Sequence, residues 1–101
     1  MIKRLPAGER FSLTDQIRRS SRGIGANIAE SWAKRRYPAH FLSKLTDADG
    51  ELQETLHWLA SIAACSYIED PELHTARDHA GIVGRLLGST INNYESFCSR
   101  Q

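Results

Sequence analysis

The residues with the most recognisable ligand spacing are Glu54 and His57, which form a Glu-x-x-His pair. On a helix these side chains lie one turn apart and can bind one iron of a di-iron carboxylate site. A complete site needs a second such pair and two further inward-facing glutamates, and the sequence contains no second pair. The pair also points away from the apolar side of its expected helix. We therefore interpret it as part of a solvated face.

The other candidate metal ligands do not form a recognisable site. His74 and His79 lack cysteine or carboxylate partners at zinc-site spacing. Cys65 and Cys98 do not form a C-x-x-C pair, and the expected helices place them roughly 40 Å apart, beyond disulfide reach. No nucleophile, base and orienting group can be grouped either. The sequence predicts a protein without metal, cofactor or enzymatic activity.

Gly23 and Gly25 have the G-x-G spacing that begins many phosphate-binding loops. A dinucleotide fingerprint needs a preceding strand and a third glycine, but the third position is Ile28. We therefore place both glycines in a helix, where each costs roughly 1 kcal/mol relative to alanine. Their small size allows another backbone to approach closely. Asn27 and Glu30 lie beside this approach, where they either bond a neighbouring group or are solvated.

The largest cluster of one chemical type is basic, and it lies on the outer arc of the first expected helix and in the connection after it. Such side chains contact phosphates, and copies of the cluster in an oligomer would add their contacts. The alternative is a solvated surface with local pairs, such as Glu30 with Lys34. A nucleic-acid-binding role therefore stands beside a purely structural one. The cluster consists of Arg18, Arg19, Arg22, Lys34, Arg35 and Arg36, with Tyr37 beside it.

Length and charge limit these possibilities. The 101 residues suit one domain, 1–101. Lys and Arg number 13 against 12 Asp and Glu, which gives a net charge of +1 and excludes the global basic field of a dedicated DNA-binding domain. We find no apolar run long enough for a membrane span, and the polar, proline-containing N-terminus does not resemble a signal peptide. The sequence predicts a cytoplasmic protein.

Three helical segments are expected to position these residues, at about 13–32, 39–66 and 71–98, and no strand is expected. Residues 1–11 are expected to be irregular, with Ser12 as the cap of the first helix. Short connections between long amphipathic helices predict an all-α, up-and-down antiparallel helical bundle. Apolar residues recur along each segment at spacings of three and four. They are Leu13, Ile17, Ile24, Ile28 and Trp32; Phe41, Leu45, Ala48, Leu52, Leu56, Leu59 and Ala63; and Leu73, Ala76, Ala80, Val83, Leu87, Ile91, Tyr94 and Cys98.

Further apolar side chains fall outside these faces, including Trp58, Ile62 and Leu86. Water would penalise that much extra apolar surface, so another helix or another subunit is expected to cover it. The sequence therefore predicts self-association. The expected interface residues are Gly23, Asn27, Glu30, Trp58, Ile62 and Leu86.

Residues 9–31, ERFSLTDQIRRSSRGIGANIAES, resemble the signature of a family of four-helix-bundle proteins encoded in intervening sequences of large-subunit ribosomal RNA genes. Residues 41–68 and 84–94 resemble the later helices of that family. The resemblance implies an up-down-up-down bundle that forms a homo-oligomer, often a homopentamer, and that has no enzymatic activity. The family is similar to accessory bundles of diversity-generating retroelements, which bind nucleic acid and partner a reverse transcriptase.

The sequence departs from this family pattern at three places. Gly25 replaces a proline, so a kink there is permitted but not enforced. Ser31 replaces a glycine, which makes a left-handed helix end less favourable there. The family usually has an opening helix before the signature, whereas this chain begins almost at the signature. The first helix of the family bundle is thus expected to be missing from this chain, either because the start of the sequence was placed late or because this member uses three helices.

Overall fold

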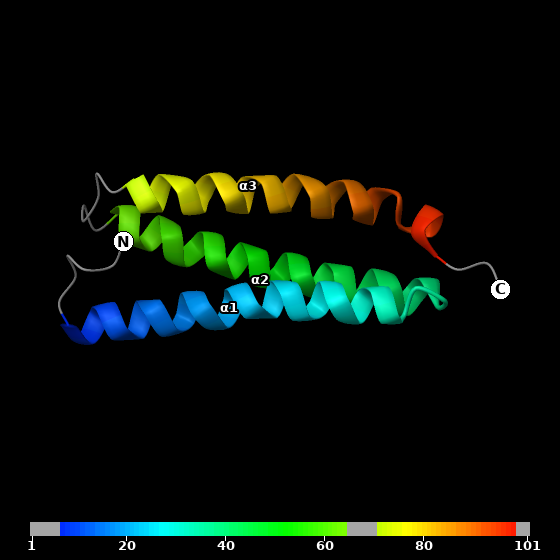
Figure 1. The fold of residues 1–101 in the computed structure, drawn as a ribbon, viewed down its shortest axis with the longest axis horizontal. Coiled ribbons are helices and arrows are strands. Elements are labelled where there is room, and N and C mark those ends of the chain that lie inside the picture. The colour runs from blue at the N-terminus through cyan, green and yellow to red at the C-terminus, as the bar shows by residue number, and fades with distance from the viewer. Residues whose placement is uncertain (1–6, 65–70, 99–101) are drawn as a thin grey trace.

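The computed structural model describes residues 7–64 and 71–98, which form three long antiparallel α-helices and one short 3-10 helix (Figure 1). The elements are α1 (Ala7–Ala33), α2 (Pro38–Ala64), α3 (Pro71–Asn92) and η1 (Tyr94–Phe97). The part of the chain that the structure describes contains no strand. The predicted all-α class and antiparallel order are confirmed.

The helix ends differ from the expected ones at two places. Helix α1 begins at Ala7, so Ser12 lies inside the helix and cannot cap it. No proline follows Pro6 before the end of α1, so nothing in this stretch of sequence interrupts the helix. At the other end of the chain, the expected third helix stops at Asn92. The Asn93 side chain donates a hydrogen bond to the Ser89 carbonyl oxygen at 2.9 Å. Asparagine competes in this way with helix continuation.

The second helix shows how the core is built. Its buried residues follow a strict alternation of four and three from end to end: Phe41, Leu45, Ala48, Leu52, Thr55, Leu59 and Ile62. The apolar stripe predicted from the sequence leaves this register at Leu56 and ends at Ala63, which are only half-buried. A shift of one residue turns a helical side chain by about 100°, so strict spacing decides which side chains face the core.

Ile62 is therefore not an uncovered side chain. It is 1 % exposed and packs with Leu13, Leu59 and Leu73, which come from all three helices. Trp58 is half-buried and packs against the same cluster. The prediction that Ile62 lies off the packing face is wrong, because the strict alternating register of α2 passes through it.

The contact between α1 and α2 uses small and polar side chains. Ser20 and Ser31 are buried on α1. Thr55 donates a hydrogen bond to Ser20 at 2.7 Å across the interface. A Cβ atom at Gly23 would lie 2.7 Å from Cδ of Glu51. Small residues on α1 thus admit side chains of α2, which lets the two helices pack closely.

Helices α1 and α3 both pack on α2, and in the described part of the chain they make no close backbone contact with each other. Figure 1 shows α2 between α1 and α3 over much of its length. The radius of gyration is 15.8 Å, compared with about 13 Å for a compact domain of this length. The side of α2 that faces the space between α1 and α3 therefore lacks a covering helix from the described part of the chain.

Candidate interaction surfaces: an open groove and a basic turn

An apolar groove runs between α1 and α3, with α2 as its floor. We call it the α1–α3 groove. One hollow of about 430 Å³ is lined by Ile28 and Trp32 of α1, Leu45 of α2, Leu86 of α3 and Phe97 of η1, among others. A second hollow, of about 260 Å³, continues toward the other end of the helices, and Val83 lines both. Its lining includes Ile17, Ser21, Leu52, Ala76 and His79.

The rim of the first hollow is strongly apolar and exposed. Leu86 is 64 % exposed, Trp32 54 %, Phe97 43 % and Ile28 38 %. These are four of the six exposed large hydrophobic side chains among the described residues. Apolar side chains grouped in this way mark interaction sites, whereas single exposed ones are ordinary. The rim is therefore the strongest candidate for a protein–protein contact.

The total exposed surface is larger than is usual for a folded monomer of this mass. The chain exposes 6609 Å², whereas a folded monomer of 11.3 kDa exposes about 5700 Å². The excess of roughly 900 Å² exceeds the ~800 Å² that each partner buries in an interface of standard size.

The rim residues of α1 were not found from the sequence because Ile28 and Trp32 were expected on the core face. Both are exposed. The inward side of α1 instead carries Ser20 and Ser31. Together with Leu13, Ile17, Ile24 and Asn27, these residues follow the same alternation of four and three as α2. The spacing of four and three marks the inward face of α1. Three of its positions are polar, however, so the pattern of apolar residues alone does not reveal this face.

The structure separates the six expected interface residues. Leu86 lies on the groove rim, whereas Ile62 is buried. The other four have partners within the chain: Gly23 lies against Glu51, the Asn27 amide donates to the Gly23 carbonyl oxygen at 2.9 Å, Glu30 pairs with Lys44 at 2.8 Å, and the Trp58 indole N–H donates to Glu54 at 3.4 Å.

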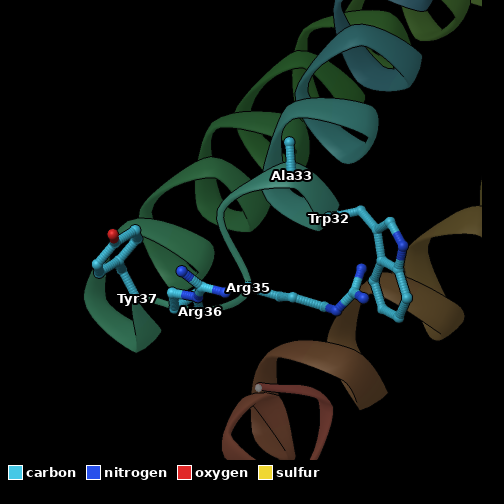
Figure 2. Close-up of a pocket in the computed structure, with 5 residues that line it drawn as sticks. All are labelled: Trp32, Ala33, Arg35, Arg36 and Tyr37. Atoms are coloured by element: carbon cyan, nitrogen blue, oxygen red, sulfur yellow. The ribbon is translucent and has the colours of Figure 1, made fainter. Parts of the chain in front are cut away.

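Three consecutive cations form a second exposed surface at the connection between α1 and α2. We call the segment Trp32–Tyr37 the basic turn. Five of its six residues, all except Lys34, line a polar hollow of about 300 Å³ (Figure 2). The Arg35 guanidinium carbon lies 4.1 Å from the centroid of the Trp32 ring, which is a cation–π contact. Lys34 and Arg36 are exposed. The turn thus combines positive charge with aromatic surface.

The basic cluster predicted from the sequence is divided in two by the length of α1. Arg22 and Lys34 are twelve residues apart, which corresponds to about 18 Å along a helix. Arg18 and Arg22 are exposed near the middle of α1. Arg19 is bound within the chain, because its guanidinium pairs with Glu54 at 2.7 Å and donates to Gln16 at the same distance. The structure brings together only Lys34, Arg35 and Arg36.

Glu30, which the solvated-surface alternative pairs with Lys34, forms its ion pair with the neighbouring helix, and the Lys34 charge acts on it only as a smaller influence that lowers its pKa. Glu30 binds Lys44 of α2 at 2.8 Å. This hydrogen bond, together with the Lys44 charge, lowers the pKa of Glu30 and raises that of Lys44. Within the part of the chain that the structure describes, Lys34, Arg35 and Arg36 form no ion pair. Their charges are therefore available to an external anion.

The side chains of Glu54 and His57 both contact other residues of this chain. Glu54 accepts hydrogen bonds from Arg19 and Trp58. The His57 ring packs edge-on against Trp58, with centroids 4.8 Å apart. No group of three or more His, Cys, Asp or Glu residues suited to a metal occurs among residues 7–64 and 71–98. Of the two cysteines, Cys65 lies outside the described residues, and Cys98 is half-buried and donates to the Tyr94 carbonyl oxygen at 3.3 Å.

The packing of two helices on a central α2 places this chain in the class of small helical-bundle proteins. The model of a family described as 23S rRNA-intervening sequence protein matches residues 1–89. The match covers most of the chain, so the protein belongs to this family, and the resemblance inferred from the sequence is confirmed. No curated protein and no solved structure matches the chain. Within the described segments, no helix is both long and apolar enough to cross a membrane.

Proposed function

We propose that this protein is a non-enzymatic, self-associating helical scaffold, in which the α1–α3 groove of one copy takes a helix from a second copy. The observation that carries the proposal is the exposed apolar rim formed by Ile28, Trp32, Leu86 and Phe97. Leaving such a surface in water costs about 25 cal/mol for each Å². A protein partner that covers it removes this cost.

A second copy of this chain suits the groove because the rim is complementary to it. The groove needs an apolar helix surface, and the exposed large apolar side chains of the described residues are concentrated on the rim itself. One copy can therefore insert its rim into the groove of another. Gly25, one turn before Ile28 on α1, has no neighbouring atom where its Cβ would lie. A second helix can therefore approach there closely.

The family resemblance favours a closed ring of five copies over a dimer. In a ring, each groove takes a helix from the next copy, and no apolar rim is left at an end. In a two-fold dimer, both grooves are filled across one axis. The rim residues are buried in either arrangement, so one mutational test serves both.

We expect Leu86→Glu to dissociate the assembly. Burying a leucine contributes about 1.5–3 kcal/mol, which corresponds to at least a tenfold change in the dissociation constant, and the buried carboxylate adds to the loss. Ile82→Glu is the matched control, because Ile82 is 46 % exposed on the same helix and does not line the groove. Light scattering over a range of concentrations measures the mass of each variant.

Three results of that experiment are decisive. A wild-type oligomer that is lost in Leu86→Glu and kept in Ile82→Glu supports the groove as the contact. A wild-type protein that is monomeric at every concentration contradicts self-association. An oligomer that survives in Leu86→Glu contradicts the groove as its interface.

Nucleic-acid binding is a second candidate function, favoured by the exposed cations of the basic turn and by Arg18 and Arg22. These side chains form no ion pair within the described residues. In an oligomer each copy adds its own cations, so phosphate contacts accumulate on a long strand. The competing possibility is a purely structural protein–protein module, in which these cations are only solvated.

Salt dependence separates these two possibilities. The logarithm of the association constant for a single strand falls with the logarithm of salt concentration, with a slope of about −0.7 for each phosphate contacted. Three contacts in the basic turn therefore give a slope of about −2. We expect this slope when labelled RNA and DNA are titrated at several salt concentrations and followed by fluorescence anisotropy. If nothing binds at low salt, or if binding is indifferent to salt, the nucleic-acid role is wrong.

A further inference from the structure

We infer that the basic turn binds unpaired nucleic-acid bases: Tyr37 stacks on a base, while Lys34 and Arg36 contact the neighbouring phosphates. This inference rests on the proposed nucleic-acid binding and specifies its ligand. It also restricts the binding residues to one end of the bundle. Among the described cations outside the turn, Arg18 and Arg22 then contribute only general attraction.

Tyr37 is placed as a stacking platform. Its side chain is 57 % exposed and lines the hollow together with Trp32, Arg35 and Arg36 (Figure 2). Its one aromatic neighbour in the described residues is His40, whose ring centroid is 5.9 Å away at an interplanar angle of 62°. No ring of the described residues therefore stacks parallel to Tyr37. Exposed aromatic rings accept any base, because every base has a π-face.

Trp32 has a different role, which is to hold Arg35. The guanidinium carbon lies over the indole ring, so the position of Arg35 is restricted before any ligand arrives. A guanidinium in a cation–π contact still has N–H donors to offer to oxygen acceptors. A fixed side chain loses less conformational entropy when it binds. We therefore assign Arg35 the role of binding a phosphate or a base edge, rather than that of a solvated surface charge.

The charges around the hollow favour a phosphate ligand. Lys34, Arg35 and Arg36 are consecutive, and Glu30, an acidic neighbour one turn before Lys34, is bound to Lys44. An acidic peptide would form ion pairs with these cations but would make no use of the Tyr37 ring. A single strand of RNA or DNA uses both features, because its phosphates and its bases alternate along the chain.

The same geometry favours an unpaired strand over a duplex. Bases in a duplex are stacked on one another, so they cannot cover the Tyr37 ring. A duplex is held mainly through phosphates, and Arg22 on α1 lies about 18 Å along the helix from Lys34. The compact turn, with the exposed ring of Tyr37 beside its cations, matches a few nucleotides of single strand.

The test compares Tyr37→Ala with Tyr37→Phe in the full chain. Stacking contributes enough affinity that its loss weakens binding of a short single-stranded RNA by about 5- to 150-fold. Tyr37→Phe keeps the ring, and we expect its affinity to remain within about twofold of wild type. Neither variant should change binding of an RNA duplex or of polyglutamate. Fluorescence anisotropy measures the affinities, and circular dichroism verifies that each variant is folded.

A second pair of measurements separates stacking from charge. Tyr37→Ala should leave the salt slope unchanged, whereas Lys34→Ala should reduce its magnitude by about 0.7, which is one phosphate contact. The inference is overturned if Tyr37→Ala binds the single strand as wild type does, or if duplex RNA or polyglutamate binds as tightly as the single strand. Salt-dependent binding that ignores Tyr37 overturns only this inference. Absence of all nucleic-acid binding overturns the proposed nucleic-acid role as well.

Discussion

Replacing Ile62 with alanine will lower the free energy of unfolding by about 2–5 kcal/mol. Ile62 is 1 % exposed, and its neighbours Leu13, Leu59 and Leu73 come from all three helices. Truncation removes buried methyl groups and leaves a cavity where those helices meet. Small domains have total stabilities of about 5–15 kcal/mol, so the loss is a large share of the total. Urea denaturation followed by circular dichroism at 222 nm measures it.

The control for this experiment is Ile82→Ala, which makes the same chemical change at a 46 % exposed position of α3. We expect that variant to stay within about 0.5 kcal/mol of wild type. The opposite pattern, in which Ile62→Ala is neutral for unfolding but dissociates an oligomer, would show that Ile62 belongs to an intersubunit contact. The comparison therefore decides between the core position that the structure gives and the interface position expected from the sequence.

Gly84→Leu will lower the free energy of unfolding by about 1–3 kcal/mol, although leucine is a much better helix former than glycine. A Cβ atom at Gly84 would lie 3.3 Å from Cδ2 of Leu52. Leu52 is 1 % exposed in the core, so it has little room to move. The larger side chain must push α3 away from α2, and overpacking of this kind is destabilising.

Gly88→Leu is the matched control, one turn further along α3. No atom lies within 4 Å of the Cβ position at Gly88, so the gain in helix propensity of up to about 1 kcal/mol is not offset there. The two substitutions should therefore shift the melting temperature in opposite directions. A similar shift for both would show that α2 and α3 are not packed as closely at Gly84 as the structure indicates.

The helices themselves could be predicted because their signals are local. Pro38 and Pro71 lie at helix starts, as expected from the fixed backbone angle of proline. Repeated apolar residues marked all three segments. The end of α3 at Asn92 was harder to predict, because it depends on a hydrogen bond from the Asn93 side chain to the Ser89 carbonyl oxygen. Apolar periodicity carries no information about that bond.

The phase of the core could not be found from hydrophobicity alone. At the centre of α2 the more apolar Leu56 was assigned to the core, but Thr55 is the buried residue. Thr55 is suited to that position because it donates a hydrogen bond to Ser20, which is buried on α1. A pair of hydroxyl groups that satisfy each other can replace apolar side chains at low cost. Such a pair is visible only when two helices are considered together.

The residue types of the basic cluster could be predicted from the sequence, but not which of its residues lie together in the fold. Proximity in the sequence predicts one surface of six cations, yet α1 separates Arg22 from Lys34, and the carboxylate of Glu54 pairs with Arg19. The cation–π contact of Arg35 on Trp32 depends on the exposure of Trp32, which was expected to be buried. Sequence reasoning identified the residue types, and the fold decided which of them act together.

Trp32 lines both the first hollow of the α1–α3 groove and the hollow of the basic turn. A single indole is thus shared by two surfaces, one apolar and one positively charged. If a neighbouring subunit immobilises the Trp32 ring, the Arg35 side chain that packs on it is immobilised as well. A nucleic-acid strand then binds an Arg35 that has less conformational freedom to lose. Thermodynamic reciprocity then requires the strand to strengthen subunit pairing by the same factor. The subunits of such an assembly associate more tightly when a strand is bound and less tightly when it is released.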